Sequence, residues 1–162
     1  MIQHHLTAFS RLLLNGKLHC LAAVMSLFWV KSYSQTPTRQ ETVEYINRIL
    51  GEKTSVELKG GNIFVTFRDD KQQVIREDKA ITPDLELNIA YEAEGKLLCI
   101  PCYRDQPECV IRTLVVQKIK RGYGRLSIPV TDEKQYEALR KAFDHLIRLV
   151  SEEGYKDAIT LD

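Results

Sequence analysis

The strongest pattern in the sequence is an amphipathic helix near its C-terminal end. Apolar residues recur at spacings of three, four and seven from Tyr136 to Val150, which places them along one side of a helix. Asp132 and Gln135 form a capping pair at its start, and Gly154 is a residue type that commonly ends helices. A helix with one apolar stripe must bury that stripe, so the rest of the chain has to supply a surface for it.

The residues before this helix alternate between apolar and polar side chains, as strands with one buried face do. Gly60-Gly61 predicts a tight hairpin, and residues 73–78 predict a polar strand at a sheet edge. Residues 85–91 alternate strictly, which predicts a half-buried antiparallel strand. Residues 110–117 are apolar on both faces, which predicts a central strand, and Gly122-Tyr123-Gly124 predicts the turn into the last strand.

A short helix precedes the strands. Residues 39–50 repeat apolar side chains at helical spacing, Thr38 and Glu41 have the form of a capping box, and Gly51 supplies the stop. The expected fold class is α+β: a short N-terminal helix, about seven antiparallel strands in a bent sheet or partly open barrel, and a long C-terminal amphipathic helix.

The first 34 residues differ in composition from the rest. They contain no acidic residue, and the 13 residues from Leu18 to Val30 include only two polar ones. This run is too short to span a bilayer, which needs about 20 apolar residues, but it matches the apolar segment of a secretory signal peptide. Small residues at Ser32 and Ser34 predict cleavage after Ser34. The competing interpretations are a buried hydrophobic helix and an uncleaved membrane anchor. The predicted organisation is a signal peptide at 1–34, a linker at 35–38, a single α+β domain at 39–154 and a tail at 155–162.

The chain resembles two groups of proteins. Its leader ending in Ser34-Gln35, its opening helix at 41–50 and its closing segment at 137–149 are similar to those of small exported proteins of unassigned function from Bacteroidota-type bacteria. Its strands followed by a C-terminal helix resemble pleckstrin-homology-like domains, in which such a helix would close the open end of a bent, two-sheet barrel. The first resemblance implies export and no particular function, and the second implies the fold alone.

Removal of the leader changes the residues that are available for chemistry. The whole chain has 23 basic and 22 acidic residues, a net charge of +1, whereas residues 35–162 keep 20 and 22, a net charge of −2, with His145 as the one histidine. One histidine excludes a zinc site built on two or three imidazoles within one chain, and no phosphate-loop or nucleophile motif is present. We therefore predict no catalytic residues, no metal and no cofactor. A net acidic, exported chain argues against nucleic-acid binding, and no stable membrane insertion is expected after leader removal.

The cysteines outside the leader are Cys99, Cys102 and Cys109. Cys102 and Cys109 flank six residues, and pairing across a hairpin would place both side chains on one face of a sheet. Because an exported chain meets oxidising conditions, we predict a disulfide between them, with Cys99 on the opposite face, buried and free. A bulge at Pro101 would swap the partners. The competing interpretation treats Cys99 and Cys102 as a redox or metal CxxC motif, or Cys109 with His145 as a thiol dyad.

Four basic residues lie around the predicted turn at 122–124: Lys118, Lys120, Arg121 and Arg125. Four cations and one aromatic ring at a hairpin tip predict a site for a phosphate, a sulfated glycan or an anionic headgroup. The competing interpretation is a solvated hairpin whose lysines discourage pairing between sheet edges.

These patterns favour an exported, non-enzymatic binding or interaction module, located in the periplasm, on the outer surface or outside the cell, whose partner is an unknown protein or anionic ligand. The alternative is a small thiol-dependent redox protein or enzyme that uses the Cys99, Cys102 and Cys109 group. The state of these three thiols distinguishes the two functions.

Overall fold

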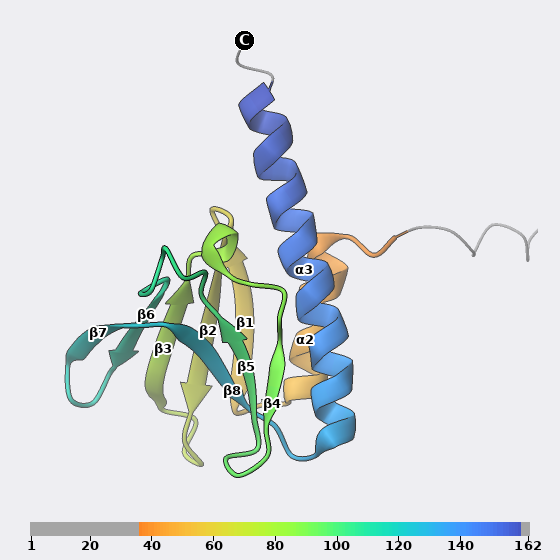
Figure 1. Ribbon diagram of the computed structural model, residues 1–162. Helices are drawn as coiled ribbons and strands as arrows, with labels where there is room; N and C mark the ends of the chain where they lie inside the picture. Colours follow the sequence, from red (N-terminus) through yellow and green to blue (C-terminus); the bar gives the residue numbers. More distant parts are fainter. Residues whose placement is uncertain (1–35, 160–162) are drawn as a thin grey trace, which may run out of the picture. The chain divides into compact units, whose positions relative to one another are not determined.

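The computed structural model describes residues 36–159 of the chain, and the side chains of residues 36–152. The predicted signal peptide at 1–34 and its cleavage site lie outside the described residues. The described part contains two α-helices, one 3₁₀ turn and eight β-strands (Figure 1). The helices are α2 (Arg39–Leu50) and α3 (Glu133–Ile159), and the 3₁₀ turn is η2 (Thr82–Asp84). The strands are β1 (Thr54–Lys59), β2 (Asn62–Arg68), β3 (Val74–Ala80), β4 (Ala90–Glu92), β5 (Leu97–Pro101), β6 (Val110–Leu114), β7 (Ile119–Tyr123) and β8 (Arg125–Pro129).

The strands form two antiparallel sheets that share one continuous segment of chain. The five-stranded sheet has the order β1-β2-β3-β6-β7, and the three-stranded sheet has the order β4-β5-β8. Only Gly124 separates β7 from β8, so this segment passes from one sheet into the other (Figure 1). The α+β prediction is confirmed, with eight strands, and the sheets do not close into a barrel. The likeness to the pleckstrin-homology plan stays a prediction.

Local sequence signals account for the ends of several elements. The Thr38 side chain accepts a hydrogen bond from the Glu41 backbone and Glu41 accepts one from the Thr38 backbone, which is the predicted capping box of α2. Gly60 and Gly61 have φ angles of 55° and 73°, the left-handed values that a tight hairpin requires. Asp132 accepts a hydrogen bond of 2.8 Å from the Gln135 backbone at the start of α3, as the capping pattern predicts.

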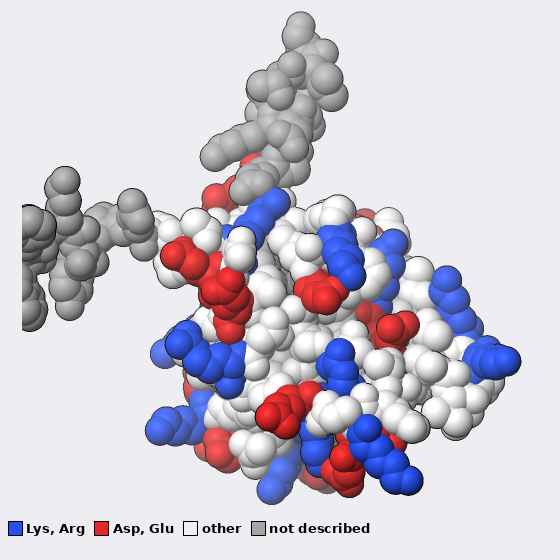
Figure 2. Space-filling view, turned by 180° about the vertical axis from the view of Figure 1, so that it is seen from behind, with Lys and Arg blue, Asp and Glu red and all other residues white. Residues whose placement is uncertain are grey.

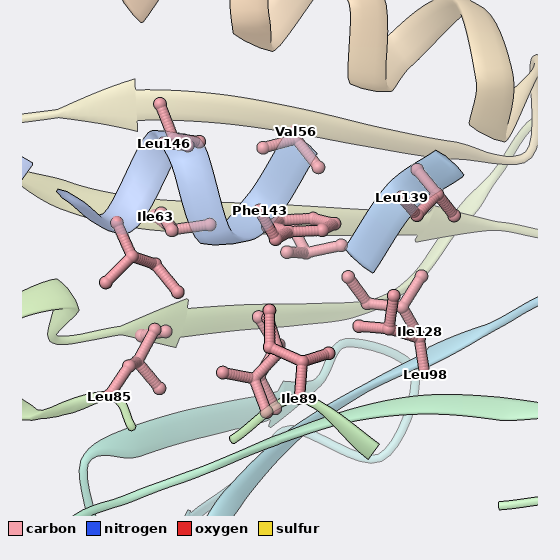
Figure 3. Close-up of a cluster of buried hydrophobic side chains, with 14 of the residues drawn as sticks. Val56, Ile63, Leu85, Ile89, Leu98, Ile128, Leu139, Phe143 and Leu146 are labelled. Atoms are coloured by element: carbon pink, nitrogen blue, oxygen red, sulfur yellow. The ribbon is translucent and has the colours of Figure 1, made fainter. Parts of the chain in front are cut away.

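The core lies between α3 and the sheets. Leu139, Phe143 and Leu146 of the predicted stripe are fully buried. Figure 3 shows Phe143 beside Val56 from β1 and facing the side chains of the three-stranded sheet. Helix α2 lies alongside α3 (Figure 1). The long helix therefore covers the sheets with its apolar stripe, as the periodicity requires.

The prediction of a strand at 85–91 is wrong. The 3₁₀ turn η2 precedes this segment, Leu85 makes a single bridge to Cys102, and only Ala90–Glu92 pairs as a strand. Leu85 and Ile89 are buried, and the Tyr136 hydroxyl of α3 donates a 3.0 Å hydrogen bond to the Ile89 carbonyl. The alternating pattern arises because one side of this segment packs in the core. The segment as a whole does not pair with a neighbouring strand.

Three other predictions differ from the structure. The polar strand at 73–78 is not an edge strand, because β3 lies between β2 and β6. The apolar run at 110–117 ends as a strand at Leu114, and the turn comes at 115–118, not at 122–124. Helix α3 continues through Gly154 to Ile159, since one glycine weakens a helix without necessarily ending it.

Neither of the two described helices contains a stretch that is long and apolar enough to cross a membrane.

Candidate functional site

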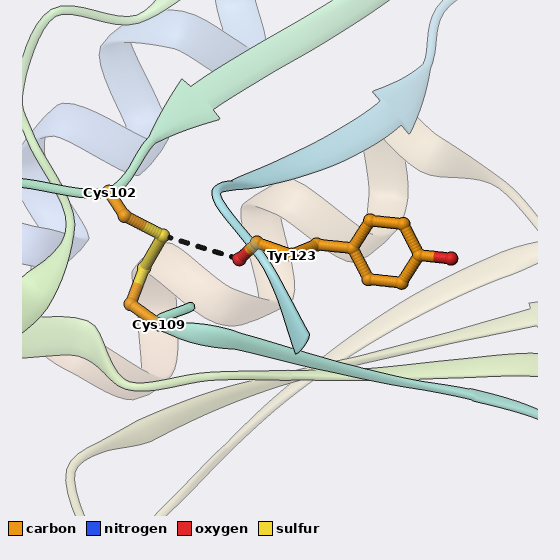
Figure 4. Close-up of a disulfide and its surroundings, with 3 residues drawn as sticks. All are labelled: Cys102, Cys109 and Tyr123. Atoms are coloured by element: carbon orange, nitrogen blue, oxygen red, sulfur yellow. Dashed lines mark hydrogen bonds between the residues drawn. A yellow bond between two sulfur atoms is a disulfide. The ribbon is translucent and has the colours of Figure 1, made fainter. Parts of the chain in front are cut away.

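The predicted disulfide joins Cys102 and Cys109, whose Cα atoms lie 5.7 Å apart (Figure 4). Cys102 follows β5, and its N–H donates to the Gly124 carbonyl at 2.9 Å. Cys109 precedes β6, and its carbonyl accepts a 2.9 Å hydrogen bond from Ile81. The crosslink therefore connects the end of a strand in the three-stranded sheet with the start of a strand in the five-stranded sheet. The Cys102 Sγ atom lies 3.6 Å from the Tyr123 carbonyl, a contact without a hydrogen bond because a disulfide sulfur carries no hydrogen.

Cys99 is free and buried, as predicted. Burial raises the pKa of its thiol above the ordinary value, an effect that the nearby Arg125 opposes. A raised pKa keeps the thiol protonated and makes it a poor nucleophile. In the oxidised protein Cys102 and Cys109 are bonded to each other, so neither offers a thiolate to a CxxC motif or a dyad.

The Nε2 atom of His145 lies 3.0 Å from the Pro37 carbonyl, and this contact holds the N-terminal end of the domain against α3.

The six residues between the bonded cysteines form an exposed loop that packs against two glycines. A Cβ atom on Gly122 would lie 2.4 Å from the Glu108 carboxylate, and one on Gly124 would lie 3.1 Å from the Pro107 carbonyl. The glycines therefore allow close packing and the passage of the chain between sheets. This explains why Gly122-Tyr123-Gly124 looks like a turn in the sequence but is not one.

The four predicted anion-binding residues lie along β7 and β8 and not around one tip. Lys118 closes the turn between β6 and β7, where its φ angle is 55°. Lys120 and Arg121 are neighbours in β7, so their side chains point to opposite faces of the sheet. Arg125 lies past Gly124 in β8 and forms a 2.9 Å ion pair with Glu92. Three exposed cations therefore follow the edge strand, and the fourth pairs within the three-stranded sheet.

On the outer face of the five-stranded sheet, the register places Phe64, Lys79 and Ile111 in one row and Glu77, Thr113 and Lys120 in the next. These residues line a shallow hollow of about 390 Å³. Seen from behind, the molecule shows basic and acidic side chains interspersed, with uncharged surface between them (Figure 2). Residues 118–123, in contrast, include three cations and no acidic residue. The hollow itself carries both signs, with Glu57 and Glu77 beside Lys59, Lys79 and Lys120, so the local excess of positive charge lies along residues 118–123.

An exposed apolar group adjoins these cations. Six large hydrophobic side chains of the described residues are exposed, and four of them lie at the tip of the β6–β7 hairpin and the adjoining start of β3: Ile75, Val115, Val116 and Ile119. Val116 is 79% exposed, and the Val115 N–H donates to the Ile75 carbonyl at 3.0 Å. Apolar side chains that gather on a surface commonly mark an interaction site.

The inner face of the same sheet holds a charged cluster that the sequence analysis missed. The Asp78 side chain is fully buried and accepts hydrogen bonds from Arg76 and Arg112. Its Oδ1 atom lies 2.9 Å from Nε of Arg76 and 3.0 Å from Nε of Arg112. Arg76 also donates to the Ser127 carbonyl of β8 at 2.8 Å, so the cluster ties the two sheets together. The signal in the sequence was that Arg76, Asp78 and the apolar Ala80 share one face of a strand.

Among the described residues, no group of three or more His, Cys, Asp or Glu side chains is arranged to hold a metal ion. No protein-family model, curated protein or solved structure matches this chain.

Proposed function

We propose that this protein is an exported, non-enzymatic binding module that engages an acidic protein partner through the β6–β7 end of its five-stranded sheet. The observation that carries the proposal is the exposed edge strand β7, which bears Lys120 and Arg121 and follows Lys118 of the preceding turn, beside four exposed apolar side chains. A surface that joins cations to apolar side chains is complementary to a partner segment that carries carboxylates and apolar residues.

Export is part of the proposal and draws its support from the disulfide. Crosslinks of this kind persist in oxidising compartments and are rare in reducing ones. The apolar segment in the first 34 residues has the form of a signal peptide, and N-terminal sequencing of the released protein would test cleavage after Ser34.

Reversing the charges on β7 should abolish the binding of a polyanionic peptide. We expect immobilised poly-glutamate to retain the protein at low salt, and the variant Lys118→Glu/Lys120→Glu/Arg121→Glu to bind about tenfold more weakly or worse, because attraction becomes repulsion. Retention should also weaken as salt screens the charges. Surface plasmon resonance at two salt concentrations measures both effects.

The matched control is Lys71→Glu/Lys134→Glu/Lys141→Glu, which reverses the same number of charges at exposed positions outside the β6–β7 hairpin and should leave retention close to that of the parent. Equal loss in the control would mean that net charge alone governs retention. Retention on heparin without retention on poly-glutamate would identify a glycan as the ligand and contradict an acidic protein partner.

The alternative thiol-dependent function makes a separate prediction about Cys99. Because burial raises its pKa, we expect native Cys99 to react with iodoacetamide at about pH 8 at least roughly tenfold more slowly than in the unfolded chain. Mass spectrometry of time points, with and without urea, measures the two rates. Rapid labelling of the native protein would favour the thiol enzyme over the binding module.

A further inference from the structure

We infer that β7 accepts an extended acidic peptide from the partner protein as an additional strand of the five-stranded sheet. This inference rests on the proposed function and specifies how the partner binds. Five features of the structure support it: the direction of the β7 backbone groups, the path of the chain after Cys102, the state of the other edges, the charges on β7 and the apolar tip.

The register shows which backbone groups of β7 face away from the sheet. Val115 donates to the Ile75 carbonyl, and Ile81 donates to the Cys109 carbonyl, so the odd-numbered residues of β6 face β3. Backbone groups alternate along an antiparallel strand, and the even-numbered residues of β6 therefore face β7. They pair with Ile119, Arg121 and Tyr123. The N–H and C=O groups of Lys120 and Gly122 consequently point outward.

The disulfide explains why this edge is not filled by β5. The Gly124 carbonyl accepts from Cys102 on the outward side, so β5 lies in line with the free edge of β7. Beyond Cys102 the chain turns away and returns to β6 at Cys109, and the crosslink closes that loop. β5 therefore ends where the free edge of β7 begins.

The other edges are engaged at one residue each by side chains of the protein itself, or are short. On β1, the Val56 N–H donates to Asn47 Oδ1 at 2.6 Å and its carbonyl accepts from Nδ2 at 2.9 Å, so an amide from α2 takes the place of a strand. On β8, Arg76 donates to the Ser127 carbonyl, and β4 has three residues. Within the described residues no hydrogen bond reaches the outward groups of Lys120 and Gly122. β7 thus differs from β1 and β8 in that no side chain of the described residues binds its outward backbone groups.

The charges on β7 select an acidic strand and oppose a second copy of this protein. Antiparallel pairing of two β7 strands over their full length would place Arg121 directly opposite Arg121 of the second copy, and like charges in that position are destabilising. A partner strand with two adjacent acidic residues presents one carboxylate on each face, beside Lys120 and beside Arg121. Glu108 lies against Gly122, so the acidic residues should lie toward the turn and not toward Gly124.

The exposed apolar tip supplies the contacts that charge alone lacks. Ile119 follows the turn at the start of β7, and Val115 and Val116 lie in that turn. Apolar residues beside the two acidic ones in a partner strand would cover these side chains and remove them from water. The competing interpretation, in which the lysines only prevent pairing between sheet edges, does not account for the exposed apolar side chains beside them.

The test uses the full-length oxidised protein and a fluorescein-labelled peptide, Val-Thr-Val-Glu-Glu-Val-Thr-Val. We expect fluorescence anisotropy to show binding, and the peptide with lysines in place of both glutamates to bind at least about tenfold more weakly. Two further versions carry N-methyl groups on the odd or on the even amides. Only one set of amides can face β7, so one version should lose binding and the other should keep it.

Amide hydrogen exchange, followed by NMR, reports the pairing directly. Exchange at Lys120 and Gly122 should slow at least about tenfold on peptide binding, whereas Arg121, which already pairs with β6, should change little. Charge-dependent binding without slower exchange at Lys120 and Gly122, or equal binding of both N-methylated peptides, would overturn strand addition and leave the proposed function standing. Failure of both this peptide and poly-glutamate to bind would overturn both. Dimerisation of the protein with slower exchange at the same amides would identify a second copy as the occupant and overturn the inference.

Discussion

Replacing Asp78 with alanine is expected to lower the free energy of unfolding by about 3–5 kcal/mol, the usual effect of removing one partner from a buried ion pair. The Asp78 carboxylate is fully buried, and the side chains of Arg76 and Arg112 are only 20% and 16% exposed. Without the carboxylate, two largely buried guanidinium groups face each other with no opposite charge. Urea denaturation followed by circular dichroism should show a lower midpoint with an unchanged m-value.

The control for this variant is Glu77→Ala, one residue away in the same strand. Glu77 is exposed on the outer face, so its loss should change the stability by less than about 0.5 kcal/mol. Replacing all three charged residues with apolar ones, Arg76→Met/Asp78→Leu/Arg112→Met, should recover much of the loss, since no buried charge then remains. A mild effect of Asp78→Ala alone would show that water or other groups solvate the arginines.

Reduction of the Cys102–Cys109 disulfide is expected to lower the free energy of unfolding by about 2.5 kcal/mol, the contribution of the loop entropy that a crosslink over a short loop removes from the unfolded chain. The two cysteines are separated by 7 positions, so the crosslink removes a modest amount of freedom from the unfolded chain. Comparing urea denaturation of the native protein with and without dithiothreitol measures the difference.

The variant Cys102→Ala/Cys109→Ala serves as the control for reduction. Its stability should be low and insensitive to dithiothreitol, because Cys99 has no disulfide partner. A stability that falls on reduction in this variant as well would mean that the reductant acts elsewhere. Equal stability of the oxidised and reduced parent would contradict a stabilising role for the crosslink.

The predictions that succeeded depend on residues close together in the chain. The capping box of Thr38 and Glu41, the cap of α3 at Asp132 and the hairpin at Gly60-Gly61 each involve neighbours within three positions. The pairing of Cys102 with Cys109 followed from a short spacing and a predicted compartment. For the candidate site, Lys118, Lys120 and Arg121 were identified, but the turn was placed at 122–124 and not at 115–118.

The predictions that failed at 73–78 and 85–91 depend on which strands become neighbours. An alternating pattern reports that one side of a segment is buried, and it does not distinguish burial against the core, as at Leu85 and Ile89, from pairing in a sheet. Gly122 is required by the Glu108 side chain that packs on it, and no local pattern marks such a contact.

The sequence by itself therefore determined the α+β class, the stripe of α3, the capped starts of α2 and α3 and the favoured pair of cysteines, because these follow from local geometry and spacing. Only the tertiary structure decided that β3 pairs with β6, which places Asp78 opposite Arg112, 34 positions further along the chain. It also decided that the chain turns away after Cys102 and leaves the edge of β7 open. Both outcomes depend on contacts between segments that lie far apart in the chain. Which segments pair is decided by the free energy of the whole fold, so no short stretch of sequence indicates it.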